Sequence, residues 1–380
     1  MVSVMKWVVL TLMSSIVSIT KGVKSMSKLT KKVTSLMVAF MLALTMVCGY
    51  GVGDVQAATT SSVLRAWNGT FEKSLAKTTG WGTIDLNFYK ADSSGRKLSS
   101  KYGTIPHGNN DRHGSVGKFL LLGGVSGDYL KVKYNGKVGY VNKYYTLINL
   151  PDVLPSIKYN ITNAHASIYK CTGKNIAEVT GRKLYETSKV QNKKINRKEY
   201  IVPILYTSAI KIAKAQKAAL GRGYCLKIYD AYRPHWVTSY VYGKFSNFLN
   251  KNRGVYGQAF SSQYGQGWFL AQNISSHNVG SAIDVTMVNY SSGAELKMPT
   301  AMHELSKRAV KYANSGTKNA KSGYARSMTS AAKTMNSIFI DAGMTTLASE
   351  WWHFQDQNGY ETNRGNADSM SGWYPQSLAY

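Results

Sequence analysis

The stretch SSHNVGSAIDVT, residues 275–286, decides the fold because it joins a polar turn to an apolar strand. From Ile283 onward, apolar and polar residues alternate with a period of two, which predicts a strand with Ile283 in the core and Asp284 on the opposite face. Gly280 stands where a chain that turns into a strand benefits from a residue without Cβ. His277 therefore comes just before the strand, and Asp284 lies on its open face.

A second segment, SEWWHF at residues 349–354, supplies another carboxylate and another histidine three positions apart. A regular strand points positions i and i+3 to opposite faces, so Glu350 is expected in the turn or bulge before a strand that contains His353. Trp351 and Trp352 are expected to pack in the core rather than to form a platform for a ligand.

The two segments contain the groups that a hydrolytic zinc ion requires. Catalytic Zn²⁺ takes three protein ligands from His and carboxylate and keeps a fourth position open for water. His277, Asp284 and His353 meet this requirement, so we expect them to bind one zinc ion. A carboxylate beside the metal must take the water's proton and pass it to the leaving amine, and Glu350 is the candidate.

A third segment, IYDAYRP at residues 228–234, ends a strand predicted at 225–229 with an arginine. An amphipathic helix is predicted before it, over residues 207–220 and closed by Gly221. A guanidinium keeps its charge at any working pH and donates two parallel hydrogen bonds, so Arg233 can stabilise an oxyanion or bind a substrate carboxylate. A structural salt bridge is the alternative role for Arg233.

Together the three segments resemble the D-alanyl-D-alanine dipeptidase family of zinc peptidases, over roughly residues 156–380. They follow the family's order, with 44 residues from Arg233 to His277 and 66 from Asp284 to Glu350. The resemblance implies that the zinc ligands are His277, Asp284 and His353 and that the catalytic base is Glu350. It also implies that Arg233 stabilises the transition state and that Ser275 lies close to the substrate.

For this catalytic region we expect an α+β domain, with a mainly antiparallel sheet that carries Asp284 and His353. Flanking helices are predicted near residues 207–220, 235–250, 301–313 and 327–342. The remaining histidines are expected to be surface or hydrogen-bonded residues: His107, His113, His165, His235 and His303.

Residues 58–150 form a separate block rich in Gly, Tyr, Lys and Ser, and predict an all-β domain. Alternating segments at 128–134 and 137–141 flank an Asn-Gly pair, the favoured two-residue hairpin turn. This hairpin resembles part of a bacterial SH3-like small barrel, which implies binding to the cell wall. The alternative is a generic β domain that binds nothing. Residues 151–155, with two prolines, are the predicted linker to the catalytic region.

Residues 1–57 have the organisation of a secretory signal peptide. Lysines precede an apolar run at 33–48, and the small residues expected before a cleavage site occur at 55–57. The run has 16 residues, short of the roughly 20 that span a bilayer. We therefore expect a secreted chain without an integral membrane segment, and we interpret residues 1–25 as a start placed upstream of the true one at Met26.

Charge indicates the class of partner. The chain has 47 basic and 19 acidic residues, and removal of residues 1–57 takes away six basic residues and one acidic residue, which leaves a net charge of +23. Such a surface attracts polyanions. The basic residues are scattered without a recognised nucleic-acid module, so anionic wall polymers or peptidoglycan, and no nucleic acid, are the expected partners. Ordinary solvated lysines are the alternative explanation.

These patterns predict a secreted, wall-associated zinc peptidase, and the resemblance implies that its substrates are peptides containing D-amino acids, with D-Ala-D-Ala as the family's substrate. A D,D- or L,D-carboxypeptidase or endopeptidase that acts on intact peptidoglycan stems is the alternative within the class. A non-catalytic wall-binding protein is the alternative from another class. Cys171 and Cys225 remain after cleavage and could pair in an oxidising compartment, which the sequence leaves open.

Overall fold

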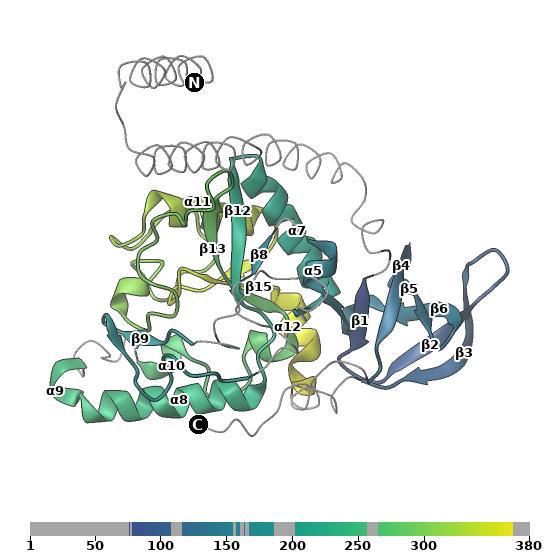
Figure 1. Ribbon diagram of the computed structural model, residues 1–380, viewed down its shortest axis with the longest axis horizontal. Helices are drawn as coiled ribbons and strands as arrows, with labels where there is room; N and C mark the ends of the chain where they lie inside the picture. The colour runs from purple at the N-terminus through teal and green to yellow at the C-terminus, as the bar shows by residue number, and fades with distance from the viewer. Residues whose placement is uncertain are drawn as a thin grey trace, which may run out of the picture. The chain divides into compact units, whose positions relative to one another are not determined.

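The computed structural model describes residue 76 and residues 78–107, 116–154, 157–159, 163, 167–185, 202–256 and 265–367 (Figure 1). The predicted signal peptide and the histidines at positions 113 and 165 lie outside the described residues. All described residues belong to one compact unit, which covers residues 60–380. No helix among them is long and apolar enough to cross a membrane.

The strands between residues 79 and 149, blue in Figure 1, form an eight-stranded antiparallel sheet together with β11. Its order is β11-β7-β1-β4-β5-β6-β2-β3. Its strands, in chain order from β1 to β7 and then β11, are Thr79–Gly82, Leu86–Ala91, Lys97–Ile105, Phe119–Ser126, Tyr129–Tyr134, Lys137–Asn142, Thr146–Asn149 and Pro203–Leu205. The all-β character predicted for this region is therefore present in the described residues. We call this structure the N-terminal sheet.

The hairpin of β5 and β6 is confirmed as predicted. Asn135 and Gly136 have φ angles of 46° and 78°, and positive φ at both central positions is what a type I′ turn requires. Alternation along β5 buries Leu130 and Val132 completely and leaves Lys131 on the outer side. One face of the sheet thus packs inward while the other carries polar residues.

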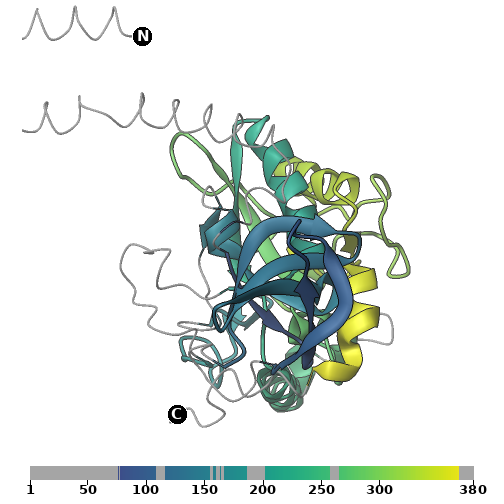
Figure 2. The ribbon, with the colours of Figure 1, turned by 90° about the vertical axis from the view of Figure 1, so that its right-hand side faces the viewer.

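The N-terminal sheet is continuous with the catalytic region. Strand β11 pairs with β7, with Pro203 opposite Asn149, and the start of the predicted linker forms the short helix α5, Leu150–Val153. At the far end of the chain, the helix α12, Gln357–Asn363, lies beside the N-terminal strands (Figure 2). Its Asn363 accepts a buried hydrogen bond of 2.7 Å from Thr83.

A five-stranded sheet of order β14-β15-β13-β12-β8 forms the centre of the catalytic region. Its strands, in chain order, are β8 Lys158–Tyr159, β12 Tyr224–Asp230, β13 Ala282–Asn289, β14 Thr345–Thr346 and β15 His353–Gln355. All neighbours are antiparallel except β8 and β12. The predicted α+β fold with a mainly antiparallel sheet is therefore confirmed for this region.

Three of the four predicted helices are present, as α7 Tyr206–Leu220, α8 His235–Lys251 and α11 Ser330–Asp341. The smaller elements of the described residues are β9 Lys170–Cys171, β10 Lys174–Asn175, α9 Arg253–Tyr256, α10 Gln266–Phe269 and the 3₁₀ turns η1 Lys143–Tyr145, η4 Ser276–Val279, η5 Lys307–Ala309 and η6 Arg364–Asn366. Cys171 and Cys225 are both buried, and no disulfide joins them, so the pairing left open by the sequence is not formed.

The helix predicted over residues 301–313 is wrong. This segment contains turns, isolated bridges and the single 3₁₀ turn η5. His303 has a φ of 55°, and a left-handed residue of this kind interrupts a right-handed helix. Lys311 donates its backbone N–H to Ala348, at 2.7 Å, instead of to a residue four positions earlier. Long-range pairing has therefore overridden a helical spacing of apolar residues.

Candidate metal centre and active site

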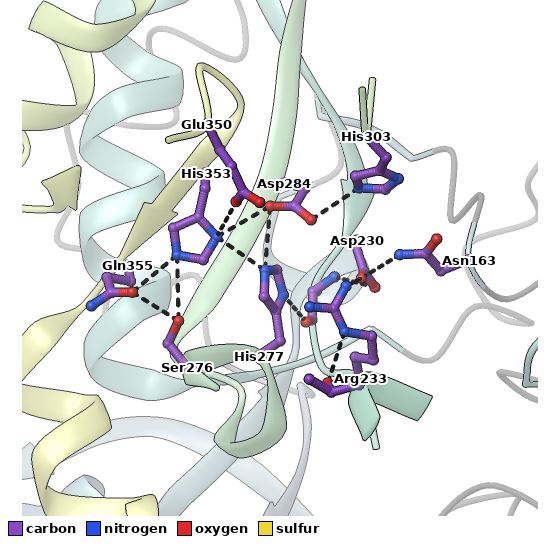
Figure 3. Close-up of polar contacts among 12 residues, drawn as sticks. Asn163, Asp230, Arg233, Ser276, His277, Asp284, His303, Glu350, His353 and Gln355 are labelled. Atoms are coloured by element: carbon purple, nitrogen blue, oxygen red, sulfur yellow. Dashed lines mark hydrogen bonds and ion pairs between the residues drawn. The ribbon is translucent and has the colours of Figure 1, made fainter. Parts of the chain in front are cut away.

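Two paired strands and the turn before them bring His277, Asp284 and His353 together (Figure 3). Asp284 on β13 lies directly opposite His353 on β15. His277 is in η4, and Gly280 with a φ of 68° turns the chain from η4 into β13, where a Cβ would also come within 2.8 Å of Leu147. Gly280 therefore has the role predicted for it, that of a residue without Cβ where the chain turns into a strand.

The three candidate ligand atoms form a nearly equilateral triangle. His277 Nε2 lies 3.2 Å from Asp284 Oδ1 and 3.2 Å from His353 Nδ1, and His353 Nδ1 lies 3.3 Å from Asp284 Oδ1. Ligands at the corners of a tetrahedron around Zn²⁺, with bonds of about 2.0–2.1 Å, are about 3.3 Å apart. The donor set and its spacing therefore fit a zinc ion with a fourth corner open.

Each candidate ligand is held by a second partner. His277 donates its Nδ1–H to the carbonyl of Ala231 at 2.7 Å, and His353 donates its Nε2–H to Gln355 Oε1 at 2.9 Å. These bonds leave the lone pairs of His277 Nε2 and His353 Nδ1 directed at the triangle. The imidazole tautomers that a metal needs are thus set by the protein.

Asp284 is fixed by His303, which donates its Nε2–H to Asp284 Oδ2 at 3.0 Å and so leaves Oδ1 for the metal. The ring of His303 stacks on Tyr169, with centroids 4.9 Å apart, and meets Trp352 edge-on. Burial raises the pKa of Asp284, but the neighbouring histidines, His277 first, outweigh it and hold that pKa well below its ordinary value. Asp284 is therefore an ionised carboxylate.

Glu350 lies immediately before the turn that leads into β15, so the position predicted for it ahead of the strand is confirmed. Its Oε2 is 3.7 Å from His353 Nδ1, beside the triangle of ligand atoms. Burial raises the pKa of Glu350 to about 8, although His353, Arg233 and Lys311 act to lower it. Glu350 is thus a buried carboxyl group next to the metal centre that is not needed as a ligand.

Arg233 follows β12 and is 5% exposed. Its Nη1 donates to Asp230 at 2.8 Å and to Tyr169 at 3.0 Å, and its Nε donates to Thr238 at 3.2 Å. The structural salt bridge considered as an alternative is therefore present. Arg233 also lines the same cavity as the candidate ligands, so its two roles are compatible.

Asp230 anchors the guanidinium of Arg233 through a short ion pair of 2.8 Å. It is completely buried and also accepts hydrogen bonds from Tyr185, at 2.7 Å, and from Asn163, at 2.6 Å. A buried carboxylate with several donors forms a rigid, charge-assisted network. This network holds Nε and Nη1, and none of these partners bonds to Nη2.

The cavity has a volume of about 210 Å³. Ser275 lines it, and the backbone N–H of Ser275 donates to Asn278 Oδ1 at 2.7 Å, which holds the start of η4 in place. Trp351 and Trp352 are each 1% exposed, in line with the packing role predicted for them, and Trp352 also faces the cavity. The apolar wall consists of Phe269, Leu270, Ala271, Ile274, Leu305, Leu347 and Trp352.

Three residues of this site were not singled out from the sequence as functional. His303 was expected to be a surface or hydrogen-bonded residue, and its partner Asp284 became evident only in the structure. The sequence did contain a signal for Asp230, because this residue lies three positions before Arg233 within the segment at residues 228–234. Gln355 lies two positions after His353 and accepts a hydrogen bond from His353 Nε2, and no spacing rule predicts this contact.

The chain belongs to a peptidase family, since a family model described as D-ala-D-ala dipeptidase matches residues 176–368. Every candidate site residue lies within that range. The chain is also similar to a D-alanyl-D-alanine dipeptidase from Enterococcus faecium, with 26% identity over 152 residues, which are 39% of this chain and 70% of the relative. Peptidases of this family are zinc-dependent in general, which agrees with the donor set described above.

His303→Phe is expected to weaken zinc binding by about 10–100-fold, the usual effect of removing a hydrogen-bond partner of a metal ligand. The phenyl ring keeps the stacking on Tyr169 but loses the bond to Asp284. Competition with a chromophoric chelator would measure the affinity, and the absorption spectrum of the cobalt-substituted protein would report the ligand geometry. His107→Phe, which alters a histidine two positions after the end of β3, is the control. An unchanged affinity and spectrum would contradict this role for His303.

Proposed function

We propose that this protein is an exported zinc metallopeptidase that hydrolyses D-alanyl-D-alanine-type bonds in cell-wall peptides. The observation that carries the proposal is the triangle of ligand atoms 3.2–3.3 Å apart, with the carboxylate of Glu350 3.7 Å from one of them. A purely structural zinc site is closed by four ligands, whereas this set has three with a buried carboxyl group beside them, which supports a catalytic site.

Each group has a chemical task in this reaction. When bound, zinc would supply Lewis acidity, which polarises a scissile carbonyl and lowers the pKa of a neighbouring water. Glu350 accepts the proton of the attacking water and returns it to the leaving amine. Because burial raises the pKa of Glu350, its ionised form is a stronger base than an exposed carboxylate.

Arg233 stabilises the negative charge that develops on the carbonyl oxygen. Its guanidinium is held by Asp230, Tyr169 and Thr238, so no reorganisation is needed when that charge appears. Ser275 is proposed to contact the substrate, because it lines the cavity next to His277. The apolar wall of the cavity excludes water from the bond that is broken.

A second candidate is a carboxypeptidase or endopeptidase that acts on intact peptidoglycan stems. The continuity of the N-terminal sheet with the catalytic region through β7 and β11 favours it, because an attached module suits a substrate fixed on a polymer. We propose that the N-terminal sheet is an SH3-like module, that residues 1–57 are a signal peptide, and that the mature protein is associated with the wall.

Product analysis by mass spectrometry would test the function. The purified, zinc-loaded protein would be incubated with free D-Ala-D-Ala and, separately, with muropeptides that bear pentapeptides. Free D-Ala from the dipeptide alone would establish a dipeptidase, and release of D-Ala or larger fragments from muropeptides would establish the second candidate. Wall binding without hydrolysis of either substrate would refute both and establish the non-catalytic alternative.

A further inference from the structure

Tyrosine rings and lysine ammonium groups gather on one outer face of the N-terminal sheet. Lys97 Nζ lies 4.1 Å from the ring centroid of Tyr89 and 4.3 Å from that of Tyr129. Lys101, paired with Tyr89 across β2 and β3, places its Nζ 5.5 Å from the same ring. The two rings meet edge-on, with centroids 5.2 Å apart. An ammonium group above an aromatic face is attracted to it, so these contacts hold the lysines in place.

Lys131 extends this cluster along β5. It lies two positions after Tyr129 and therefore on the same side of the strand, opposite the buried Leu130. Across the sheet Lys131 pairs with Tyr140, which in turn pairs with Tyr89. We call these five residues the tyrosine–lysine face: Tyr89, Lys97, Lys101, Tyr129 and Lys131.

The charge of the tyrosine–lysine face is not compensated by the sheet around it. No described residue forms an ion pair with Lys97, Lys101 or Lys131. The acids described between residues 78 and 149 are bonded to other partners: Asp85 to His107, Asp92 to Arg96, and Asp128 to Lys143. Ordinary solvated surfaces intersperse charges of both signs. Three like charges on one face, with no ion-pair partner among the described residues, instead form a surface that attracts a polyanion.

The position of Lys97 over the two tyrosine rings indicates which class of polyanion can bind. Proteins that bind single-stranded nucleic acid stack bases on open aromatic faces. Here Lys97 lies over both Tyr89 and Tyr129, so the rings serve to hold an ammonium group rather than to receive a base or a sugar ring. Recognition then depends on charge alone, which suits a polymer with regularly spaced phosphates.

We propose that the tyrosine–lysine face binds a phosphodiester polymer of the cell envelope and thereby holds the peptidase on the wall. This inference rests on the proposed export and wall association. Because β7 pairs with β11 and Leu205 at the end of β11 donates its N–H to the carbonyl of Gly280, the sheet that carries this face is joined to the segment next to His277. A bound polymer would raise the local concentration of wall peptides at the metal centre.

Sedimentation of the full-length, zinc-loaded protein with isolated Gram-positive-type walls would test the proposal. The face variant is K97Q/K101Q/K131Q, and the matched control is K214Q/K217Q/K318Q, which removes the same charge from exposed positions of the catalytic region. The face variant is expected to bind walls about tenfold more weakly or worse, with a shallower salt dependence, because three phosphate contacts are lost. The control variant is expected to stay within about twofold of the unaltered protein.

Three outcomes would overturn the proposal. Equal losses in both variants would make net charge the cause, and equal binding to walls stripped of phosphodiester polymers by hydrofluoric acid would exclude those polymers. Single-stranded DNA that competes better than native walls at equal phosphate concentration would show that bases add to binding and would assign the surface to nucleic acid. Turnover of soluble muropeptides, measured on the same preparations, is expected to be unchanged in the face variant. This measurement distinguishes a failure of the peptidase proposal from a failure of the wall-binding proposal.

Discussion

Glu350→Gln is expected to keep one zinc ion per chain and to lose turnover by about 10²–10⁴-fold, the usual contribution of a general base. Glutamine has nearly the shape of the carboxyl group, so it fills the same buried position 3.7 Å from His353 Nδ1, but it cannot accept the proton of the attacking water. Metal content by mass spectrometry and kcat on a soluble peptide would be measured on the same sample.

The control for this variant is Glu361→Gln, which alters a carboxylate exposed on α12 that pairs with Arg364. It is expected to leave both zinc content and turnover unchanged. If Glu350→Gln lost its zinc, Glu350 would be a ligand rather than a base. Full turnover with zinc retained would require a different proton acceptor in the cavity.

His277→Ala is expected to lose its zinc completely under dialysis. Its zinc affinity is expected to fall by more than the roughly 10–100-fold that results when a metal ligand loses its hydrogen-bond partner. The substitution removes one corner of the triangle and leaves only two donors, Asp284 Oδ1 and His353 Nδ1, which are 3.3 Å apart. Turnover is expected to disappear with the metal, in contrast to Glu350→Gln, which keeps it.

Zinc content after dialysis, together with circular dichroism, would measure this effect. His107→Ala is the control and is expected to retain zinc, because His107 lies after the end of β3 and pairs with Asp85. The order of zinc affinities is then expected to be unaltered protein, His303→Phe and His277→Ala, from tightest to weakest. Stoichiometric zinc in His277→Ala would show that the ligand set contains another residue.

Local sequence patterns predicted those elements whose structure is determined by the residues within them. The alternation from Ile283 onward identified β13, the Asn-Gly pair identified the hairpin of β5 and β6, and the rule that positions i and i+3 diverge placed Glu350 ahead of β15. Residues adjacent in sequence set each of these features, because periodicity and turn chemistry act over a few positions. The same locality explains why α7 was predicted to within one residue of its start.

Long-range pairing determined the features that were missed. The helix expected over 301–313 had the right spacing of apolar residues, but His303 adopts a positive φ and reaches Asp284, nineteen positions earlier. Likewise, β11 pairs with a strand that precedes it by more than 50 positions, and no local pattern marks such a partner. Tertiary contacts of this kind override propensity wherever they bury more surface than the local alternative.

The strand pair β7–β11 has a consequence for how this enzyme can be taken apart or recombined. A chain cut at residue 155 would separate Pro203–Leu205 from Thr146–Asn149 and leave an unpaired strand edge on the catalytic region. Such edges promote aggregation. The catalytic region would therefore be a poor candidate for expression alone or for fusion to a foreign targeting module, and the two regions are expected to be inherited together.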